Sequence, residues 1–313
     1  MHKKHKKKCY LIKNIIKYIN SDKKLKGRRR KYNFLLRYFE VWKYNFHYLQ
    51  DIFNHPNRKY NLKILLKYVI HILITGLSYR SITDFSNSKI HWNTIYKFVI
   101  KLQQYNVITS TYYNTVNKYI SKKNKTIKNK SNILLTDTTL ISNKLGIDNI
   151  GYNPQHPKHK VSKVSLITDV NGIPLMANIY NGSTYDSKIL DIQLNDFIIK
   201  YPKMLTNNNI LLGDAGYDSN KLKDKVKNNN IGVLLTARNK RNIKDKNKLE
   251  ALKLSDKEKQ LLKNRIKVEH VNAQLKKYKR LSIRYDKYSN NYTLFLHLSC
   301  IDIILRHMLY RTN

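Results

Sequence analysis

Two short apolar runs, each ending at a carboxylate, stand out in the hydrophobic pattern of the middle of the chain. Residues 133–136 precede Asp137, and residues 210–213 precede Asp214. Runs of this length that stop at a polar residue are typical of buried strands. Open α/β sheets build their sites at the carboxyl ends of such strands, so both aspartates are candidate site residues. A turn or a helix cap is the simpler role for either one alone.

The pattern around these runs predicts a mixed sheet with helices on its faces. Three strands in a meander are followed by alternating helices and strands. After the Asp137 strand we predict strands at 161–168 and 173–180, a helix at 187–201, the Asp214 strand, a helix at 219–228 and a strand at 232–236.

Three other aspartates in this region have local explanations. Asn171-Gly172 announces a hairpin turn, which accounts for Asp169. Asp218 is expected to cap the helix that follows it. Asp186 is either a helix cap or a partner of the site, and the sequence does not decide between these roles.

A charged stripe marks the helix predicted at 255–280, where Ser255 and Glu258 form a capping box. At roughly 100° per residue, Arg265, Glu269 and Lys276 fall within about 40° of one another. Apolar positions flank the stripe on both sides, at Leu262, Ile266 and Ala273 and at Leu261, Val268, Val271 and Leu275. This pattern predicts a half-buried carboxylate between two cations, which a divalent metal would stabilise. The alternative is an exposed ion pair that contributes a few tenths of a kcal/mol.

The N-terminal third of the chain is predicted to be helical, at 62–75, 79–85 and 92–104. Such an arrangement is typical of a helix-turn-helix reader of DNA, with base or phosphate contacts from Trp92, Asn93, Thr94 and Lys97 at the start of the third helix. A three-helix packing unit without base contacts is equally consistent with the pattern. The polar, basic segment 121–131 is the expected linker, which gives domains at 1–120 and 132–313.

Composition permits a polyanionic partner. Lys and Arg number 61 against 20 acids, a net charge of +41, although codons rich in A and T can raise Lys without selection for binding. Two cysteines, Cys9 and Cys300, are too few for a disulfide framework and fit a reducing interior. His156 and His159 could bind metal, but a surface loop explains them more simply. Charged residues in the apolar stretch 292–309 predict a core helix and not a membrane span. The basic start of the chain, residues 1–8, lacks the pattern of a signal peptide and is expected to be an arm that contacts phosphates, or a nuclear address.

Several motifs occur in an order that resembles DDE transposases of bacterial insertion sequences, over roughly residues 60–285, and most closely the insertion-sequence-four and insertion-sequence-five groups. The motifs are Asp137-Thr-Thr, the 163–175 hairpin, Gly182-Ser-Thr-Tyr-Asp-Ser187, Gly213-Asp-Ala-Gly-Tyr-Asp-Ser219 and Arg265-x3-Glu269-x6-Lys276. That family has a tyrosine three residues before the arginine, where this chain has Leu262.

The resemblance implies a ribonuclease H-like catalytic domain behind a helix-turn-helix-like domain. Asp137, Asp214 and Glu269 would hold two Mg²⁺ ions, for which Mn²⁺ substitutes, while Arg265 and Lys276 would bind phosphates at the element end. The implied activity is that of a Mg-dependent polynucleotidyl transferase, a transposase that cleaves strands of double-stranded DNA and joins them to a target. A homodimer on DNA is expected, inside a bacterial cell or in a nucleus or viral factory, with no membrane association. The alternatives are an inactive or domesticated DNA-binding protein and a nuclease of the same fold that cuts without joining.

Overall fold

The computed structural model describes residues 59–60, 62–85, 90–126, 132–237 and 253–310. The chain divides into two compact units, residues 1–102 with 305–313, and residues 103–304. The basic arm and residues 127–131 of the expected linker lie outside the described residues. Residues 121–126 of that linker are the last turns of helix α7 (Val107–Thr126). Lysine is a good helix former, so a basic composition does not by itself predict an irregular segment.

Helix α7 packs with the larger unit, and the chain therefore divides before this helix and not after it. Its Tyr112 is fully buried and donates a hydrogen bond to the Pro174 carbonyl at 3.1 Å. Thr109 is hydrogen-bonded to His297 at 3.1 Å. These contacts attach α7 to the strand that begins at Pro174 and to the C-terminal helix that contains His297.

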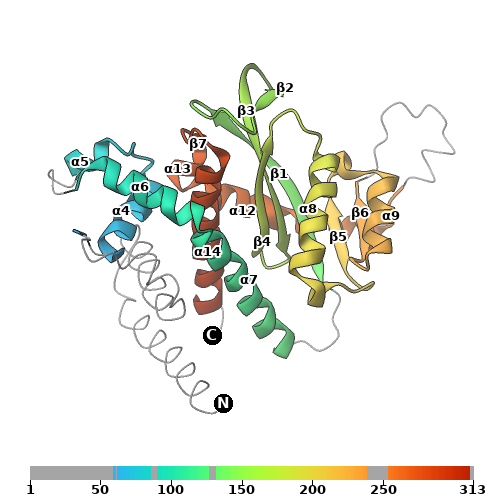
Figure 1. Ribbon diagram of the computed structural model, residues 1–313. Helices are drawn as coiled ribbons and strands as arrows, with labels where there is room; N and C mark the ends of the chain where they lie inside the picture. Colours follow the sequence, from blue (N-terminus) through green and yellow to red (C-terminus); the bar gives the residue numbers. More distant parts are fainter. Residues whose placement is uncertain (1–58, 61, 86–89, 127–131, 238–252, 311–313) are drawn as a thin grey trace, which may run out of the picture. The chain divides into compact units, whose positions relative to one another are not determined.

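A single sheet organises the described part of the larger unit (Figure 1). Its strands are β1 (Ile133–Asn143), β2 (Gly151–Asn153), β3 (His156–Asp169), β4 (Pro174–Asn181), β5 (Ile210–Gly213), β6 (Val233–Thr236) and β7 (Ile283–Arg284). The five main strands lie in the order β4-β3-β1-β5-β6, with β3 antiparallel to β1 and β4, and with β5 parallel to β1 and β6. This mixed sheet confirms the predicted ribonuclease H-like fold.

The turn between β3 and β4 forms as its sequence predicts. Gly172 has a φ of +75°, which glycine adopts without strain. The Asp169 carboxylate accepts hydrogen bonds from the backbone N–H groups of Asn171 and Ile173, both at 3.0 Å. Asp169 therefore serves the turn.

Helices cover the sheet. They are α8 (Asp186–Lys200), α9 (Asn220–Asn228), α11 (Asp256–Leu262), α12 (Ile266–Lys276), α13 (Lys279–Ser282) and α14 (Ser289–Tyr310). α8 packs against β4, and α12 packs against β1 and β3. The capping box of Ser255 and Glu258 starts α11 as predicted. The single helix predicted to 280 is instead interrupted by a 3-10 turn, η3 (Lys263–Arg265), before α12 begins.

The C-terminal helix α14 confirms the predicted core helix. His297 and Asp302, which interrupt its apolar pattern, are both buried and hydrogen-bonded. His297 Nε2 bonds to the Ala177 carbonyl at 2.9 Å, and the Tyr278 hydroxyl donates to Asp302. Throughout the described ranges, the helices are either too short or too polar to cross a bilayer.

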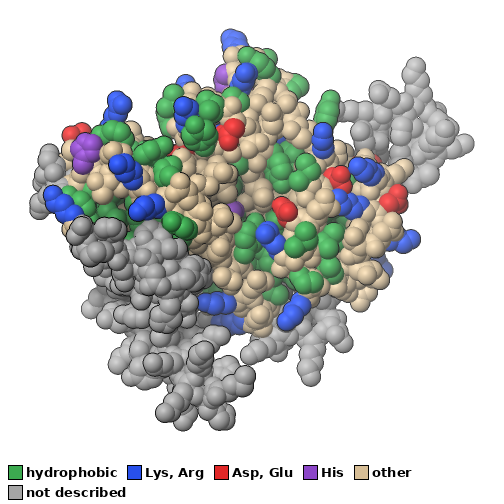
Figure 2. All heavy atoms as spheres, viewed as in Figure 1, with side chains coloured by type: hydrophobic (Ala, Val, Ile, Leu, Met, Phe, Trp, Pro, Cys, Tyr) green, Lys and Arg blue, Asp and Glu red, His purple; other side chains and the backbone are tan. Residues whose placement is uncertain are grey.

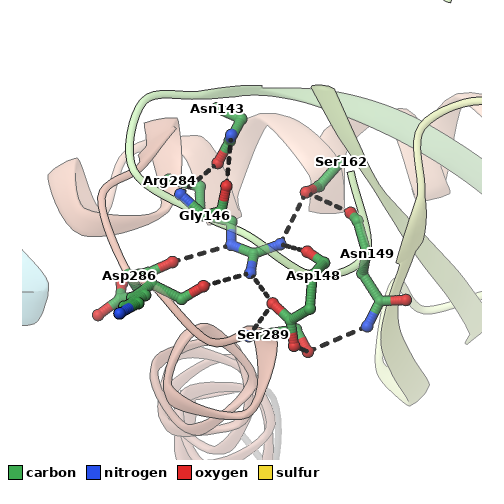
Figure 3. A network of polar contacts seen from close by, with 9 residues as sticks. Asn143, Gly146, Asp148, Asn149, Ser162, Arg284, Asp286 and Ser289 are labelled. Atoms are coloured by element: carbon green, nitrogen blue, oxygen red, sulfur yellow. Dashed lines mark hydrogen bonds and ion pairs between the residues drawn. The ribbon is translucent and has the colours of Figure 1, made fainter. Parts of the chain in front are cut away.

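A buried arginine joins β7 to the loop after β1 and to β3 (Figure 3). Arg284 on β7 is fully buried and forms an ion pair with Asp148, in the loop after β1. It also donates to Ser162 Oγ on β3 at 3.0 Å and to the Asp286 carbonyl at 3.1 Å. A side chain on Gly146 would lie 2.6 Å from Arg284 Nε, so a glycine is required where the guanidinium enters the loop.

The smaller unit contains the three helices predicted from the sequence, α4 (Leu62–Thr75), α5 (Ser81–Phe85) and α6 (Trp92–Gln104), of which the last two residues belong to the larger unit. Gly76 follows α4 with a φ of +72° and closes the helix through a bond from its N–H to the Ile72 carbonyl. The Trp92 N–H donates to Thr83 Oγ1 at 3.1 Å, which joins the start of α6 to α5.

Candidate active site

The register of the sheet places the two predicted aspartates level with each other. Leu135 on β1 is paired with Leu212 on the parallel strand β5. Asp137 and Asp214 each lie two residues further along, where β5 has just ended and β1 continues. The order of the strands reverses between β1 and β5, and this is the position where open α/β sheets bind ligands.

Helix α12 reaches the same place from its packing position against β1. Asn272 is buried, and its Nδ2 donates a hydrogen bond to Asp137 Oδ2 at 2.8 Å. Glu269 lies one helical turn before Asn272 and so points along the same side of the helix. Asn272 is not among the predicted site residues, because one asparagine on a helix gives no recognisable pattern in the sequence.

The pKa of Asp137 depends on the charges of other predicted site residues. The pKa of Asp137 is raised from 3.8 to about 6, chiefly because burial disfavours its charged form. The positive charge of Arg265 counteracts this rise, while the negative charges of Asp214 and Glu269 add to it. Three charged residues, one after β5 and two in η3 and α12, therefore act on one carboxylate of β1.

The environment of α12 corrects one prediction. Val268, Val271 and Leu275 are buried, but Ile266 is 50% exposed and Ala273 is exposed. Glu269 is itself exposed and not half-buried, so the charged stripe is flanked by packing surface on one side only. Only the side of α12 that carries Val268, Val271 and Leu275 packs against the sheet, so Ile266 and Ala273 on the other side stay exposed.

The two cations of the stripe differ in their surroundings. Arg265 lies in η3 and is half-buried, and its Nε atom is buried without a hydrogen-bond partner in the described part of the chain. Lys276 ends α12 and is exposed. Leu262, at the position of the family tyrosine, ends α11 and is half-buried.

Asp214 is held by the turn that follows β5. It caps the 3-10 helix η2 (Ala215–Tyr217), and its Oδ1 accepts the Gly216 N–H at 2.8 Å. A side chain on Gly213 would lie 2.9 Å from the Tyr217 ring, so this glycine makes room for Tyr217. The prediction that Asp218 caps α9 is wrong. Ser219 occupies that position, and Asp218 accepts bonds from Lys223 Nζ and Thr236 Oγ1.

The structure resolves the role of Asp186, which the sequence left open. Asp186 is the first residue of α8, and the cap position belongs to Tyr185. Its Oδ1 accepts hydrogen bonds from Lys163 Nζ at 2.8 Å and from Thr138 Oγ1 at 2.9 Å. Thr138 follows Asp137 directly, so Asp186 is a partner of the site. No sequence signal connects Lys163 with Asp186.

The chemistry of these side chains suits a divalent cation. Carboxylate oxygens are the ligands that Mg²⁺ and Mn²⁺ prefer. Burial is the main cause of the raised pKa of Asp137, and a cation would relieve the repulsion from Asp214 and Glu269 that adds to it. Among the described residues, no three His, Cys, Asp or Glu side chains are close enough together to hold a metal ion. The acids are thus within electrostatic range of one another but not in a coordination geometry. His156 and His159 lie on the outer end of β3, their rings 5.6 Å apart, in a hairpin with β2.

The residues predicted to contact DNA from the smaller unit lie in the first turn and a half of α6. Lys97 is exposed, while Trp92, Asn93 and Thr94 are half-buried. The Arg80 guanidinium lies 5.7 Å from the Trp92 ring. Lys and Arg side chains are scattered over the visible face of the molecule (Figure 2). DNA contact by α6 stays a prediction.

Comparisons with known proteins agree with this interpretation. Residues 96–301 match the family model described as Transposase DDE domain. Among solved structures, the Mos1 transposase paired-end complex with left transposon end is 10% identical over 72% of this chain and 81% of that chain, with a TM-score of 0.24. The Mos1 mariner paired end complex with Mn is 11% identical over 72% and 81%, with a TM-score of 0.25. No similar sequence is found among curated proteins. At such TM-scores, the fold assignment depends on the strand order of the sheet itself.

Proposed function

The chain belongs to the transposase DDE domain family, and from this premise we propose that it is a metal-dependent transposase that cleaves and joins DNA strands at the ends of a mobile element. The observation that supports this function best is the convergence of Asp137, Asp214, Glu269 and Arg265 on one position, as their mutual effect on the pKa of Asp137 indicates. Three acids near one another are what a two-metal phosphoryl-transfer site requires.

Asp137, Asp214 and Glu269 would hold the two Mg²⁺ ions, or Mn²⁺ in their place. When bound, such ions activate the attacking oxygen and stabilise the leaving oxygen of an in-line displacement. Asn272 orients Asp137 through its hydrogen bond of 2.8 Å. Arg265 supplies a positive charge next to the acids and carries a buried donor without a partner in the described residues, so it is placed to meet a DNA phosphate.

DNA binding would involve both units. Lys276, seven residues after Glu269, is exposed and suited to a phosphate contact, and α6 would contribute Trp92, Asn93, Thr94 and Lys97. The net charge of +41 favours association with any polyanion. Leu262 has no hydroxyl to donate to the DNA end, so the proposed grip depends more heavily on Arg265 and Lys276. We further propose a homodimer, since two element ends must be paired before transfer.

An assay with the purified full chain tests this function. The substrates are a duplex carrying the DNA that flanks the gene, a target plasmid, and either Mg²⁺ or Mn²⁺. We expect cleaved and joined products with the wild type, and neither product with Asp137→Asn, Asp214→Asn or Glu269→Gln, all three of which should still bind DNA. Cleavage without joining would identify a nuclease, and binding without cleavage would identify an inactive relative. Wild-type rates from any one variant would remove that acid from the assignment.

A further inference from the structure

Two neighbouring loops expose large apolar side chains next to lysines. The first loop, residues 144–149, follows β1, and the second, residues 285–288, lies between β7 and α14. Backbone hydrogen bonds join the two loops, from the Lys144 N–H to the Arg284 carbonyl at 2.9 Å and from the Ile147 N–H to the Lys287 carbonyl at 3.0 Å. Their exposed side chains form a surface that we call the tyrosine platform: Lys144, Leu145, Ile147, Tyr285, Lys287 and Tyr288.

The apolar members of the tyrosine platform are strongly exposed for their size. Leu145 is 62% exposed and Ile147 56%, while Tyr285 is 43% exposed and Tyr288 47%. Single exposed apolar residues are common on protein surfaces, whereas several that lie together mark a binding surface. On the face shown in Figure 2, hydrophobic and basic side chains lie next to one another over the position that β7 has in Figure 1. The tyrosine platform is therefore a candidate for contact with another molecule.

The acids of the two loops are engaged by internal partners, which leaves the tyrosine platform positively charged. Asp286 is buried and forms two hydrogen bonds with the Arg280 guanidinium, at 2.6 and 3.1 Å. Both carboxylate oxygens of Asp148 accept hydrogen bonds, from Arg284 and from Ser289 (Figure 3). The two lysines of the platform are exposed and form no ion pair with a residue that the structure describes. Their charge is available to an anionic partner.

Buried Arg284 also holds the two loops in one arrangement. Its guanidinium donates to the Asp148 carbonyl at 2.7 Å in the first loop and to the Lys287 carbonyl at 3.3 Å in the second. A surface that is fixed before binding loses less conformational entropy when it binds. Tyrosine side chains add a large contact area with few rotatable bonds. The tyrosine platform is thus preorganised for its partner.

A DNA strand with unpaired bases fits this combination of side chains. Lysines attract the phosphates of such a strand, while its bases stack on aromatic rings. A fully paired duplex keeps the faces of its bases inside the helix and would leave Tyr285 and Tyr288 without a stacking partner. A second copy of the chain, placed on the same surface by two-fold symmetry, would bring the lysines of both copies together and repel them.

We propose that the tyrosine platform binds unpaired bases of the element end while the acids act on a phosphate of the same DNA. This inference rests on the proposed function and names the form of DNA that this surface accepts. Cutting one strand of a duplex creates a strand end whose bases are free to leave the double helix. Lys144 follows Asp137 by seven residues. At roughly 3.3 Å per residue, the platform begins at most about 23 Å from Asp137, which corresponds to about seven nucleotides of a strand.

Fluorescence anisotropy of the full chain with a labelled oligothymidine strand is the first test. We expect Tyr285→Ala and Tyr288→Ala each to weaken binding about fivefold or more, because the stacking of one base is lost. Tyr285→Phe and Tyr288→Phe should stay within twofold of the wild type, because the ring remains. Binding of a blunt duplex of the same length should change less than twofold in all four variants.

Tyr152 provides a matched control. It is 59% exposed on β2, and Lys160 Nζ lies 5.8 Å from the centroid of its ring. The corresponding distance from Lys287 to the Tyr288 ring is 5.7 Å. Tyr152→Ala should change binding of the strand less than twofold, because the two loops of the platform are untouched.

Four results would overturn the proposal. They are unchanged strand binding by both alanine variants, an equal loss of duplex binding, phenylalanine variants as weak as the alanine variants, and an equal loss with Tyr152→Ala. Analytical ultracentrifugation adds a further check. If the wild type dimerises and the alanine variants do not, while all bind the strand equally, the platform is a contact between two copies of the chain and the proposal is wrong.

Photocrosslinking of the unmodified full chain decides the question even if the alanine variants do not fold. End DNA carrying 5-iododeoxyuridine at unpaired positions within about seven nucleotides of the cut should crosslink to Tyr285 or Tyr288. Crosslinks that all lie outside the two loops would overturn the proposal. Strand binding does not require cleavage, so the two proposals fail separately. A wild type that crosslinks through the platform but never cleaves end DNA refutes the proposed function alone, and one that cleaves without these crosslinks refutes the platform alone.

Discussion

Replacing Asp137 by Asn should stabilise the metal-free protein, and the gain should depend on pH. The folded pKa of Asp137 is raised from 3.8 to about 6, so the folded state binds this proton more tightly than the unfolded state. The wild type therefore loses stability as the pH rises from about 4 to about 6, and the loss is complete above that range. The rise in pKa corresponds to about 3 kcal/mol at ~1.4 kcal/mol per pH unit. Asparagine carries no charge, retains an oxygen that can accept from Asn272, and escapes this loss.

Urea unfolding of the metal-free wild type and Asp137→Asn at pH 4 and pH 8 measures the effect. We expect the variant's advantage to be larger at pH 8 than at pH 4 by up to about 3 kcal/mol. Asp191→Asn serves as a control of opposite sign. The pKa of Asp191 is lowered, chiefly by its hydrogen bond from Lys225, so its replacement should cost stability at both pH 8 and pH 4, and the cost should disappear only as the pH falls below 3.8. Equal differences at both pH values for Asp137→Asn would refute the electrostatic account of the site. At pH 8, addition of Mg²⁺ should reduce the difference in free energy of unfolding between Asp137→Asn and the wild type, because the cation stabilises the charged acids of the wild type and not the variant.

Three further predictions concern the turn, the DNA contact and the buried arginine. Gly213→Ala would place a carbon 2.9 Å from the Tyr217 ring, so we expect a loss of about 1–3 kcal/mol in urea unfolding, whereas Gly216→Ala should mainly weaken metal binding. Lys276→Ala should weaken binding to end DNA and reduce the slope of log K against log salt by about 1, as measured by fluorescence anisotropy. Cleavage at saturating protein should stay near the wild-type rate. An unchanged slope would exclude a phosphate contact. Arg284→Met removes the donors to Ser162 Oγ and to the Asp286 carbonyl as well as the ion pair with Asp148, so we expect a loss of about 1–3 kcal/mol in urea unfolding; an unchanged free energy of unfolding would contradict this role for Arg284.

The parts of the site that the sequence predicted are those that depend on strand periodicity. Asp137 and Asp214 could be placed at one edge of a sheet because each follows an apolar run, and the register of β1 with β5 makes them level. The Asn171-Gly172 turn and its aspartate were predictable for a similar reason, since the backbone conformation is encoded locally.

The parts that the sequence could not predict depend on contacts between distant segments. Asn272 and Lys163 acquire their roles only when α12 and β3 are brought next to β1 and α8. The exposure of Ile266 depends on which side of α12 packs against β1 and β3, and the helical period alone does not specify this. Asp218 follows the pattern of a helix cap, yet Lys223 and Thr236 provide it with tertiary partners instead.

The central place of β1 has a consequence for a chain that is still being translated. β1, β3 and β4 are close in sequence and can pair soon after they leave the ribosome, and α4 to α6 precede them. β5 and α12, which bring Asp214 and Glu269, emerge much later. A nascent or prematurely terminated copy would thus keep the helices of the smaller unit without a complete set of acids. On the proposed function, such fragments would lack acids that hold the metal, so DNA cleavage would require the chain at least through α12.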